Sequence, residues 1–217
     1  METAYPSLKR PSLEAVLIFH LSSYRSVHVK RLIVGLTGAS GVVFGIRLLE
    51  VLQDNSEVET HLIISKGAEV TLRLETDRTV EEVKALADVV HEHDHLAASL
   101  SSGSFRVSGM VVIPCSMKSL AQIALSLSDN LLTRATDVTL KERRKLVIVP
   151  RETPLHLGHL RHMTAVAEMG GVILPPVPSF YHGPLTIMDL VDQTVGKVLD
   201  QFEIEHSLFR RWGGNDA

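Results

Sequence analysis

The sequence predicts an α/β fold of three layers, in which helices cover both faces of a doubly wound, mostly parallel sheet of the Rossmann or flavodoxin type. Short apolar runs rich in valine, isoleucine and leucine recur along the chain, and segments with apolar residues at helical spacing lie between them. Runs without alternation are typical of strands buried on both faces, as in parallel sheets. Small and polar residues follow these runs directly, where a strand would turn into a helix.

The length of 217 residues suits one domain with a substantial core, which we expect at residues 29–217. Residues 1–28 contain prolines, serines and one short apolar run, so we expect an extension that is disordered or precedes the native start. The formal net charge of -3 gives no support for nucleic-acid binding, and no apolar run is long enough to span a membrane. The single cysteine, Cys115, fits the reducing cytoplasm, and the 45% share of hydrophobic residues suggests contacts between subunits.

The stretch LIVGLTGASGVVFG at residues 32–45 predicts a buried strand, a tight glycine turn and the start of a helix over residues 42–52. In such a junction free N–H groups and the helix dipole favour an anion. The glycines follow neither the G-x-G-x-x-G dinucleotide pattern nor the Walker pattern, which needs Lys and then Ser or Thr after the last glycine. We therefore expect a mononucleotide phosphate, with the Thr37 and Ser40 hydroxyls as donors; a turn that binds nothing is the alternative.

A second strand is predicted at residues 58–65 and ends at Ser65. The carboxyl ends of parallel strands lie at one edge of the sheet, where ligands of open α/β sheets bind, so Ser65 is a candidate for the same site. It also suits the N-cap of a helix predicted over residues 66–74, and the two roles do not exclude each other. Another helix is predicted at residues 80–87.

His91, His93 and His95 alternate in the next segment and could in principle face one metal ion. The segment is polar and lacks a separate carboxylate or cysteine signature, so we expect a solvated loop that continues through the serine-rich residues 99–104, and no metal.

A third buried strand, at residues 110–114, precedes a short polar turn and a helix that is predicted to reach Leu127. Ser116 and Ser119 bring hydroxyls to the start of this helix, and Lys118 brings a cation. Nothing near Cys115 in the sequence activates it as a thiolate, so we expect a small, half-buried residue rather than a nucleophile.

Residues 131–144 have helical spacing and place Arg134, Asp137 and Lys141 on one face, which by itself predicts an exposed, ion-paired surface. A strand at residues 146–150 then delivers an Arg and a Glu, residues 151 and 152, to the edge of the sheet where α/β enzymes keep site residues.

The histidines of the following helix lack the H-E-x-x-H spacing of zinc enzymes, so we expect them to cap the helix or face solvent. A last strand at residues 171–174 leads into the proline-rich residues 175–181, which could wall a pocket. A helix is predicted at residues 186–202, and the tail contains the only tryptophan, Trp212.

Five separated segments resemble the UbiX-type flavin prenyltransferases: GLTGASGVVFGIRLL, ETHLIISK, VIPCSMKSLAQIA, LLTRATDVTLKERRKLVIVPRETPLHLGHL and PPVPSFYH. The resemblance covers residues 29–212. It implies metal-independent transfer of a dimethylallyl group from dimethylallyl monophosphate to N5 and C6 of reduced FMN. The prenylated FMN would then serve a separate UbiD-type decarboxylase. The family also implies a homo-oligomer, a dodecamer with sites between its subunits.

The resemblance further implies roles for individual residues. The expected FMN contacts are Gly38, Ala39, Ser40, Ser65, Ser116, Met117, Lys118, Ser119 and Arg151. Contacts to dimethylallyl phosphate are expected at Tyr181 and Lys197, where some relatives carry Arg in place of the lysine. The expected catalytic positions are Ser40, Glu75, Arg134, Lys141, Glu152 and Trp212.

Breaking the allylic C–O bond builds positive charge on the prenyl fragment and negative charge on the leaving phosphate. Four groups are expected to stabilise that phosphate: Arg134, Lys141, Tyr181 and Lys197. We expect Trp212 and the flavin to shield the cation, Glu152 to move the proton that C6 loses, and Ser40 to hydrogen-bond near N5.

Three alternatives remain. Flavin-dependent cysteine decarboxylases carry Pro-x-Met-Asn where this chain reads Pro-Cys-Ser-Met-Lys at residues 114–118, which argues against them. Direct decarboxylation of phenolic acids would need a metal or a cluster of acidic residues, and the sequence offers neither. A flavin-binding carrier would need the glycine turn and Arg151, but not Glu152, Lys141 and Tyr181 together.

Overall fold

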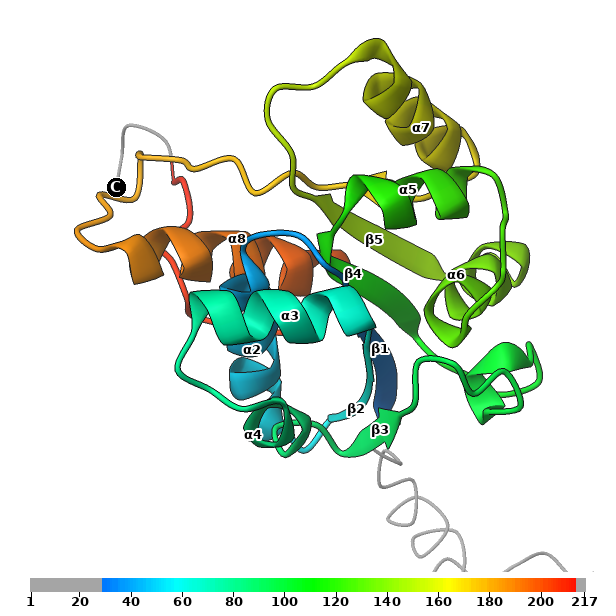
Figure 1. Ribbon diagram of the computed structural model, residues 1–217. Coiled ribbons are helices and arrows are strands. Elements are labelled where there is room, and N and C mark those ends of the chain that lie inside the picture. The colour runs from blue at the N-terminus through cyan, green and yellow to red at the C-terminus, as the bar shows by residue number, and fades with distance from the viewer. Residues whose placement is uncertain (1–28, 214–217) are drawn as a thin grey trace, which may run out of the picture.

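The computed structural model describes residues 29–213, so the expectations for residues 1–28 lie outside the described residues. Six strands form one sheet in the order β3-β2-β1-β4-β5-β6, and every neighbouring pair is parallel. Helices lie on both faces of this sheet (Figure 1). The predicted fold class, a doubly wound parallel sheet in three layers, is confirmed.

The strands are short and mostly buried, as their apolar sequences predict. They are β1 (Lys30–Leu36), β2 (Val58–Ile64), β3 (Val89–His91), β4 (Gly109–Cys115), β5 (Lys145–Pro150) and β6 (Val172–Ile173). Alternate residues of one strand enter opposite cores. Leu32, Val34 and Leu36 of β1 belong to one cluster, and Ile33 belongs to the other.

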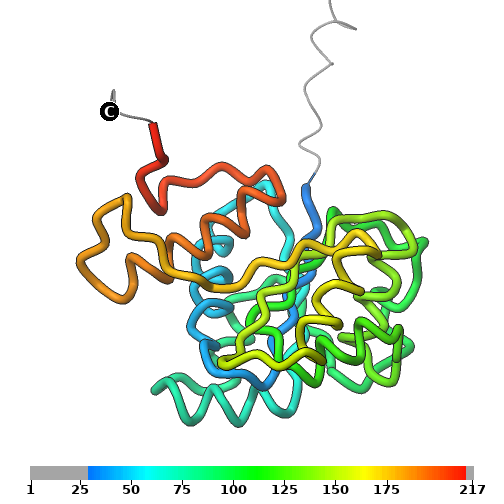
Figure 2. Tube along the Cα trace, turned by 90° about the horizontal axis from the view of Figure 1, so that it is seen from above, coloured from blue at the N-terminus to red at the C-terminus, as the bar shows by residue number. Residues whose placement is uncertain are grey.

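Two sets of helices cover the two faces. The helices are α2 (Val42–Gln53), α3 (Lys66–Glu75), α4 (Val80–Lys84), α5 (Met117–Ala124), α6 (Leu131–Lys141), α7 (Leu157–Glu168) and α8 (Ile187–Gln201). Apolar residues of α2, α3, α4 and α8 share one core with the sheet, and those of α5, α6 and α7 share the other. The C-terminal segment, red in Figure 2, runs back along α8.

The chain changes direction across the sheet between β1 and β4. From β1 it proceeds to β2 and β3 on one side, and it then returns to build β4, β5 and β6 on the other. In open α/β sheets ligands bind outside the carboxyl ends of the strands at such a switch point. The ends of β1 and β4, at Leu36 and Cys115, therefore mark the expected position of the site.

The prediction of a solvated loop at the histidine-rich segment is wrong for His91, which belongs to β3 at the edge of the sheet. Its Nε2 lies 2.9 Å from Nδ1 of His61, and Nε2 of His61 lies 2.7 Å from the Glu59 carboxylate. Burial lowers the pKa of His91, with smaller contributions from His61 and His95. A polar network of side chains therefore joins β3 to β2.

Three helices end earlier than their sequences predict. The helix predicted over residues 80–87 ends at Lys84, and the one predicted to reach Leu127 ends at Ala124. The helix predicted over residues 131–144 ends at Lys141, and Arg143 adopts a positive φ of 55° just beyond it. Beyond α4 the chain still packs on the core through Leu86 and Ala87, whereas beyond α5 the side chains of Leu125 and Leu127 are exposed.

Candidate functional site

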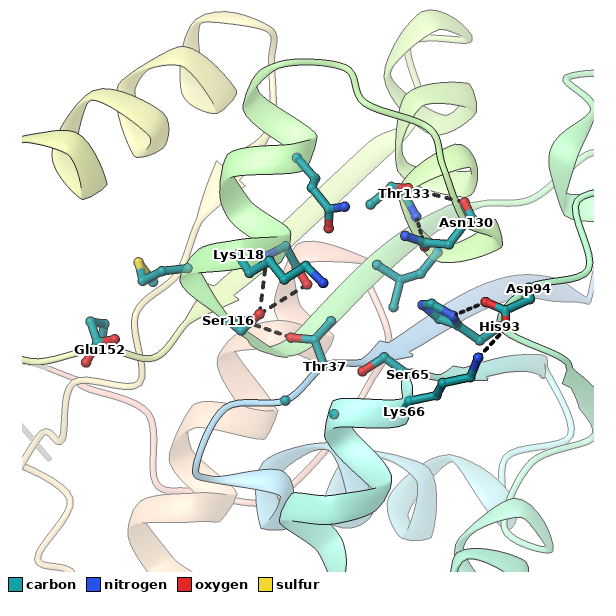
Figure 3. Close-up of a pocket in the computed structure, with 16 residues that line it drawn as sticks. Thr37, Ser65, Lys66, His93, Asp94, Ser116, Lys118, Asn130, Thr133 and Glu152 are labelled. Carbon is teal, nitrogen blue, oxygen red and sulfur yellow. Dashed lines mark hydrogen bonds and ion pairs between the residues drawn. The ribbon is translucent and has the colours of Figure 1, made fainter.

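A cavity of about 560 Å³ lies at the switch point, outside the carboxyl ends of β1, β2 and β4. Its walls come from the turn after β1, the starts of α3, α5 and α6, and the loop after β3, as Figure 3 shows. The lining residues are Thr37, Gly38, Ser65, Lys66, Gly67, His93, Asp94, Ser116, Met117, Lys118, Ser119, Gln122, Asn130, Leu132, Thr133 and Glu152. Six of the nine expected FMN contacts are among them.

Two helix N-termini line this cavity. The Ser65 hydroxyl accepts the Ala68 N–H at 3.1 Å and caps α3, while the Ser116 hydroxyl accepts the Ser119 N–H at 3.2 Å and caps α5. The first N–H groups of each helix have no intrahelical partner, and the helix dipoles favour an anion in front of them. Ser65 is thus the N-cap of α3, as predicted, and it also lines the cavity, while its contact with a ligand stays a prediction.

The start of α2 is not the open anion site that its glycine turn predicts. The Glu75 carboxylate accepts the N–H groups of Gly41 and Val42, at 2.8 and 3.4 Å. A carboxylate at this position satisfies the helix dipole in place of a phosphate. The Thr37 hydroxyl, expected as a donor to phosphate, instead donates to the carbonyl oxygen of Pro114 at 2.9 Å. The candidate anion-binding groups of the cavity are therefore the N-termini of α3 and α5.

A second cavity, of about 540 Å³, adjoins the turns after β1 and β5. Ser40, Arg151 and Glu152 line it, together with the proline-rich residues 175–178, so that segment does wall a pocket as predicted. Glu152 lines both cavities and therefore lies between them. Ala39 lines neither cavity; its N–H donates to the Thr37 carbonyl oxygen at 2.8 Å.

Of the residues expected to bind the prenyl donor, Tyr181 contacts the C-terminal tail and Lys197 lies near Asp200, which holds that tail; neither lines either cavity. The rings of Tyr181 and Trp212 meet edge to face at 5.8 Å, and the Arg210 guanidinium donates to the Tyr181 carbonyl oxygen at 3.4 Å. Asp200 of α8 pairs with Arg211 at 2.7 Å and lies 3.6 Å from the Lys197 ammonium. Hydrogen bonds from Arg211 and from His206 lower the pKa of Asp200. The tail is thus anchored on α8 with its tryptophan against Tyr181.

Lys141 lies apart from these groups within one chain. The first turn of α6 lines the 560 Å³ cavity, whereas Lys141 is its last residue, about 15 Å further along the axis. Lys141 lines another cavity, of about 470 Å³, with Arg143 and Arg144. Its ammonium pairs with Glu142, so the predicted ion pairing along one face holds only for Arg134 and Asp137, at 2.8 Å.

Several cavity residues were not predicted from the sequence. Asn130 caps α6 by accepting the Thr133 N–H at 3.0 Å, and an asparagine before an apolar-periodic segment was a usable signal for it. Lys66 and Asp94 form a 2.7 Å ion pair beside the cavity, and His93 joins them although its segment was expected to be a solvated loop. No local pattern indicates that pair, because its members come from different elements.

Cys115 is fully buried rather than half-buried, and burial strongly raises the pKa of its thiol. A protonated thiol without access to substrate is no nucleophile. Of the later histidines, His156 caps α7 by accepting the Gly158 N–H at 3.0 Å, as predicted. Within residues 29–213, no group of three or more ligating side chains is placed to hold a metal ion, and no helix has the length and apolarity to cross a membrane.

Gly38 and Gly67 touch backbone to backbone on the wall of the cavity. A Cβ added to Gly38 would lie 2.9 Å from the Gly67 Cα, whereas one added to Gly67 would lie 3.2 Å from the Gly38 Cα. We expect Gly38→Ala to lower the free energy of unfolding by about 1–3 kcal/mol and to weaken FMN binding, because two backbones must separate. Gly67→Ala should cost less, since alanine also favours the helix.

Urea unfolding and FMN titration of both variants would show whether Gly38→Ala costs more stability and FMN affinity than Gly67→Ala. Equal stability of Gly38→Ala and the wild type, with equal FMN affinity, would show that the glycine contact does not shape the cavity.

Comparison with known proteins agrees with this fold. The model of the flavoprotein family matches residues 20–211. Flavin prenyltransferase UbiX of Escherichia coli K12 is 59% identical over 188 residues, which cover 86% of this chain and 100% of that protein. The crystal structure of a dodecameric FMN-dependent UbiX-like decarboxylase from Escherichia coli O157:H7 superposes with a TM-score of 0.83 at 52% identity, over 85% of this chain and 100% of the other.

The crystal structure of AnUbiX (PadA1) in complex with FMN and dimethylallyl pyrophosphate gives a TM-score of 0.83 at 51% identity. The superposition covers 85% of this chain and 98% of the other.

Proposed function

This chain belongs to the flavoprotein family and, within it, to the UbiX flavin prenyltransferases, and on that basis we propose that it prenylates reduced FMN. It is a prenyltransferase that binds FMN. The dimethylallyl group is transferred to N5 and C6 of the flavin. The observation that carries the proposal is the cavity at the switch point, where two capped helix N-termini offer an anion site in a chain 59% identical to an established member.

In this proposal the FMN phosphate lies before the first turns of α3 and α5. Unpartnered N–H groups at Gly67, Met117 and Lys118 bind it there. The flavin ring then extends toward the second cavity, where Ser40 and Arg151 contact it and Glu152 faces both spaces. The volume of the first cavity supports FMN as its ligand, because about 560 Å³ falls in the range of pockets that bind small molecules and cofactors.

The prenyl donor is dimethylallyl monophosphate, held by Tyr181 and Lys197 beside Trp212. As the allylic C–O bond breaks, the Lys197 ammonium and the Tyr181 hydroxyl stabilise the departing phosphate. The Trp212 ring, two-thirds exposed and held against Tyr181, can shield the positive charge on the prenyl fragment. Glu152 accepts the proton that C6 loses.

The enzyme assembles as a homo-oligomer, a dodecamer whose sites lie between subunits. The separation of Lys141 from the cavity of its own chain supports this arrangement, because in a shared site Lys141 acts at the prenyl donor of a neighbouring chain. Large apolar side chains at Leu74, Leu185 and Ile187 are 79 to 93% exposed in the single chain, as surfaces that another subunit covers are. The prenylated FMN passes to a UbiD-type decarboxylase in the cytoplasm.

The direct test is anaerobic incubation of the protein with reduced FMN and dimethylallyl monophosphate, and in parallel with dimethylallyl pyrophosphate. Mass spectrometry of the flavin should show prenylated FMN, formed faster from the monophosphate. Recovery of unmodified FMN with both donors would favour a flavin carrier. Release of CO₂ from a phenolic acid or a peptidyl cysteine by the protein alone would favour a decarboxylase.

A further inference from the structure

Thr37 joins the two turns that frame the switch point. It follows β1 directly and is 1% exposed. Its Oγ1 donates to the Pro114 carbonyl oxygen at 2.9 Å and accepts the Ser116 N–H at 2.7 Å. The Thr37 N–H also points to the Pro114 oxygen, at 3.2 Å. Three hydrogen bonds thus connect the end of β1 with the end of β4, where no strand pairing continues.

The direction of these bonds limits what Thr37 can do. A backbone N–H can only donate and a carbonyl oxygen can only accept, so the single hydroxyl proton must go to Pro114. No proton remains for a phosphate. The hydroxyl is therefore committed to the protein rather than to the anion.

Two cavity walls depend on the position of Thr37. Ser116, whose N–H it accepts, is the N-cap of α5, so the bond fixes the start of that helix relative to β1. The next residue, Gly38, packs on the Gly67 backbone in the first turn of α3. Displacement of Thr37 would therefore move the N-termini of α3 and α5 relative to each other.

We propose that Thr37 is a positioning residue, whose hydroxyl holds the turn after β1 against the start of α5 and so preorganises the cavity for flavin. Its effect on catalysis passes through flavin binding and not through the prenyl donor, which other residues hold. The inference rests on the proposed function in that FMN is the ligand of this cavity.

The test compares Thr37→Val, which keeps the side-chain shape but removes the two hydrogen bonds of the hydroxyl, with Thr37→Ser, which keeps the hydroxyl. Thr60→Val is a matched control. Thr60 is also 1% exposed, and its Oγ1 donates to the Asp88 carboxylate at 2.9 Å and accepts the Asp88 N–H at 3.0 Å. It lies in the first half of β2 and lines none of the three cavities described above.

We expect Thr37→Val to raise both the FMN dissociation constant and the KM for FMN about tenfold or more, equivalent to about 1.4 kcal/mol. The KM for dimethylallyl phosphate should stay unchanged. Thr37→Ser should restore FMN affinity to near the wild-type value. Thr60→Val should lower the melting temperature without changing the FMN dissociation constant.

The proposal is overturned if Thr37→Val binds FMN as the wild type does, if serine fails to rescue, or if Thr60→Val weakens FMN binding equally. If the valine variant does not fold, Thr37→Cys replaces it. Its weakly hydrogen-bonding thiol should then give an FMN affinity clearly below that of the serine variant, and equal affinities would overturn the proposal.

Wild-type protein that binds FMN but forms no prenylated flavin would refute the proposed function, and the FMN affinities of the variants would still test the role of Thr37. Failure of the wild type to bind FMN would refute both.

Discussion

Replacement of Glu152 by glutamine is expected to slow prenyl transfer by about 10²–10⁴-fold, the usual contribution of a general base, while FMN still binds. Glu152 follows β5 and lines both cavities, so its carboxylate can face a flavin that spans them. Its Oε1 accepts the Thr153 N–H at 3.0 Å, which leaves Oε2 for the proton from C6. Glutamine keeps the shape and the hydrogen bond but cannot accept that proton.

Single-turnover formation of prenylated FMN, followed by mass spectrometry or absorbance, would measure the effect. Glu168→Gln is the matched control, because Glu168 is exposed at the end of α7 and lines none of the three cavities described above. It should react at the wild-type rate. A full rate in Glu152→Gln would mean that another group takes the proton.

Strand and helix positions near the site could be predicted from local sequence. The apolar run at residues 32–36, the glycine turn and the helix from Val42 lie where the structure has β1 and α2, to within a few residues. The caps at Ser65 and Ser116 follow from the same kind of local pattern. The edge strand β3 could not be predicted. It has only three residues, and its pairing depends on His61, thirty positions before His91.

The fine structure of the site depends on contacts between distant residues, which the sequence does not display. The glycine turn predicts an anion at the start of α2, but Glu75, over thirty positions later, already supplies one. The hydroxyl of Thr37 suggests a ligand donor, but its partner is Pro114 in another strand. In both cases the local sequence correctly predicts the turn and the helix. The group that each residue binds is set by a residue far away in the sequence.

Replacement of Lys141 by alanine is expected to reduce prenyl transfer by about 10²-fold or more, since the loss of a cation at the leaving oxyanion costs that much in comparable sites. Lys141 lies beside Arg143 and Arg144, away from the 560 Å³ cavity of its own chain, so in the proposed shared site it would act on a neighbouring subunit. Lys84→Ala is the control: this lysine of α4 pairs with Glu81 and lines none of the cavities described above. It should retain full activity.

A site shared between chains predicts that two inactive variants rescue each other. When Lys141→Ala and Glu152→Gln subunits are dissociated, mixed equally and reassembled, some sites receive Glu152 from one variant and Lys141 from the other. About a quarter of the wild-type rate should return if every site draws these residues from two different, randomly mixed chains. Each variant reassembled alone should stay inactive. If mixing restores nothing although Lys141→Ala is inactive, both residues act within one chain, and α6 must then move to bring Lys141 to the flavin.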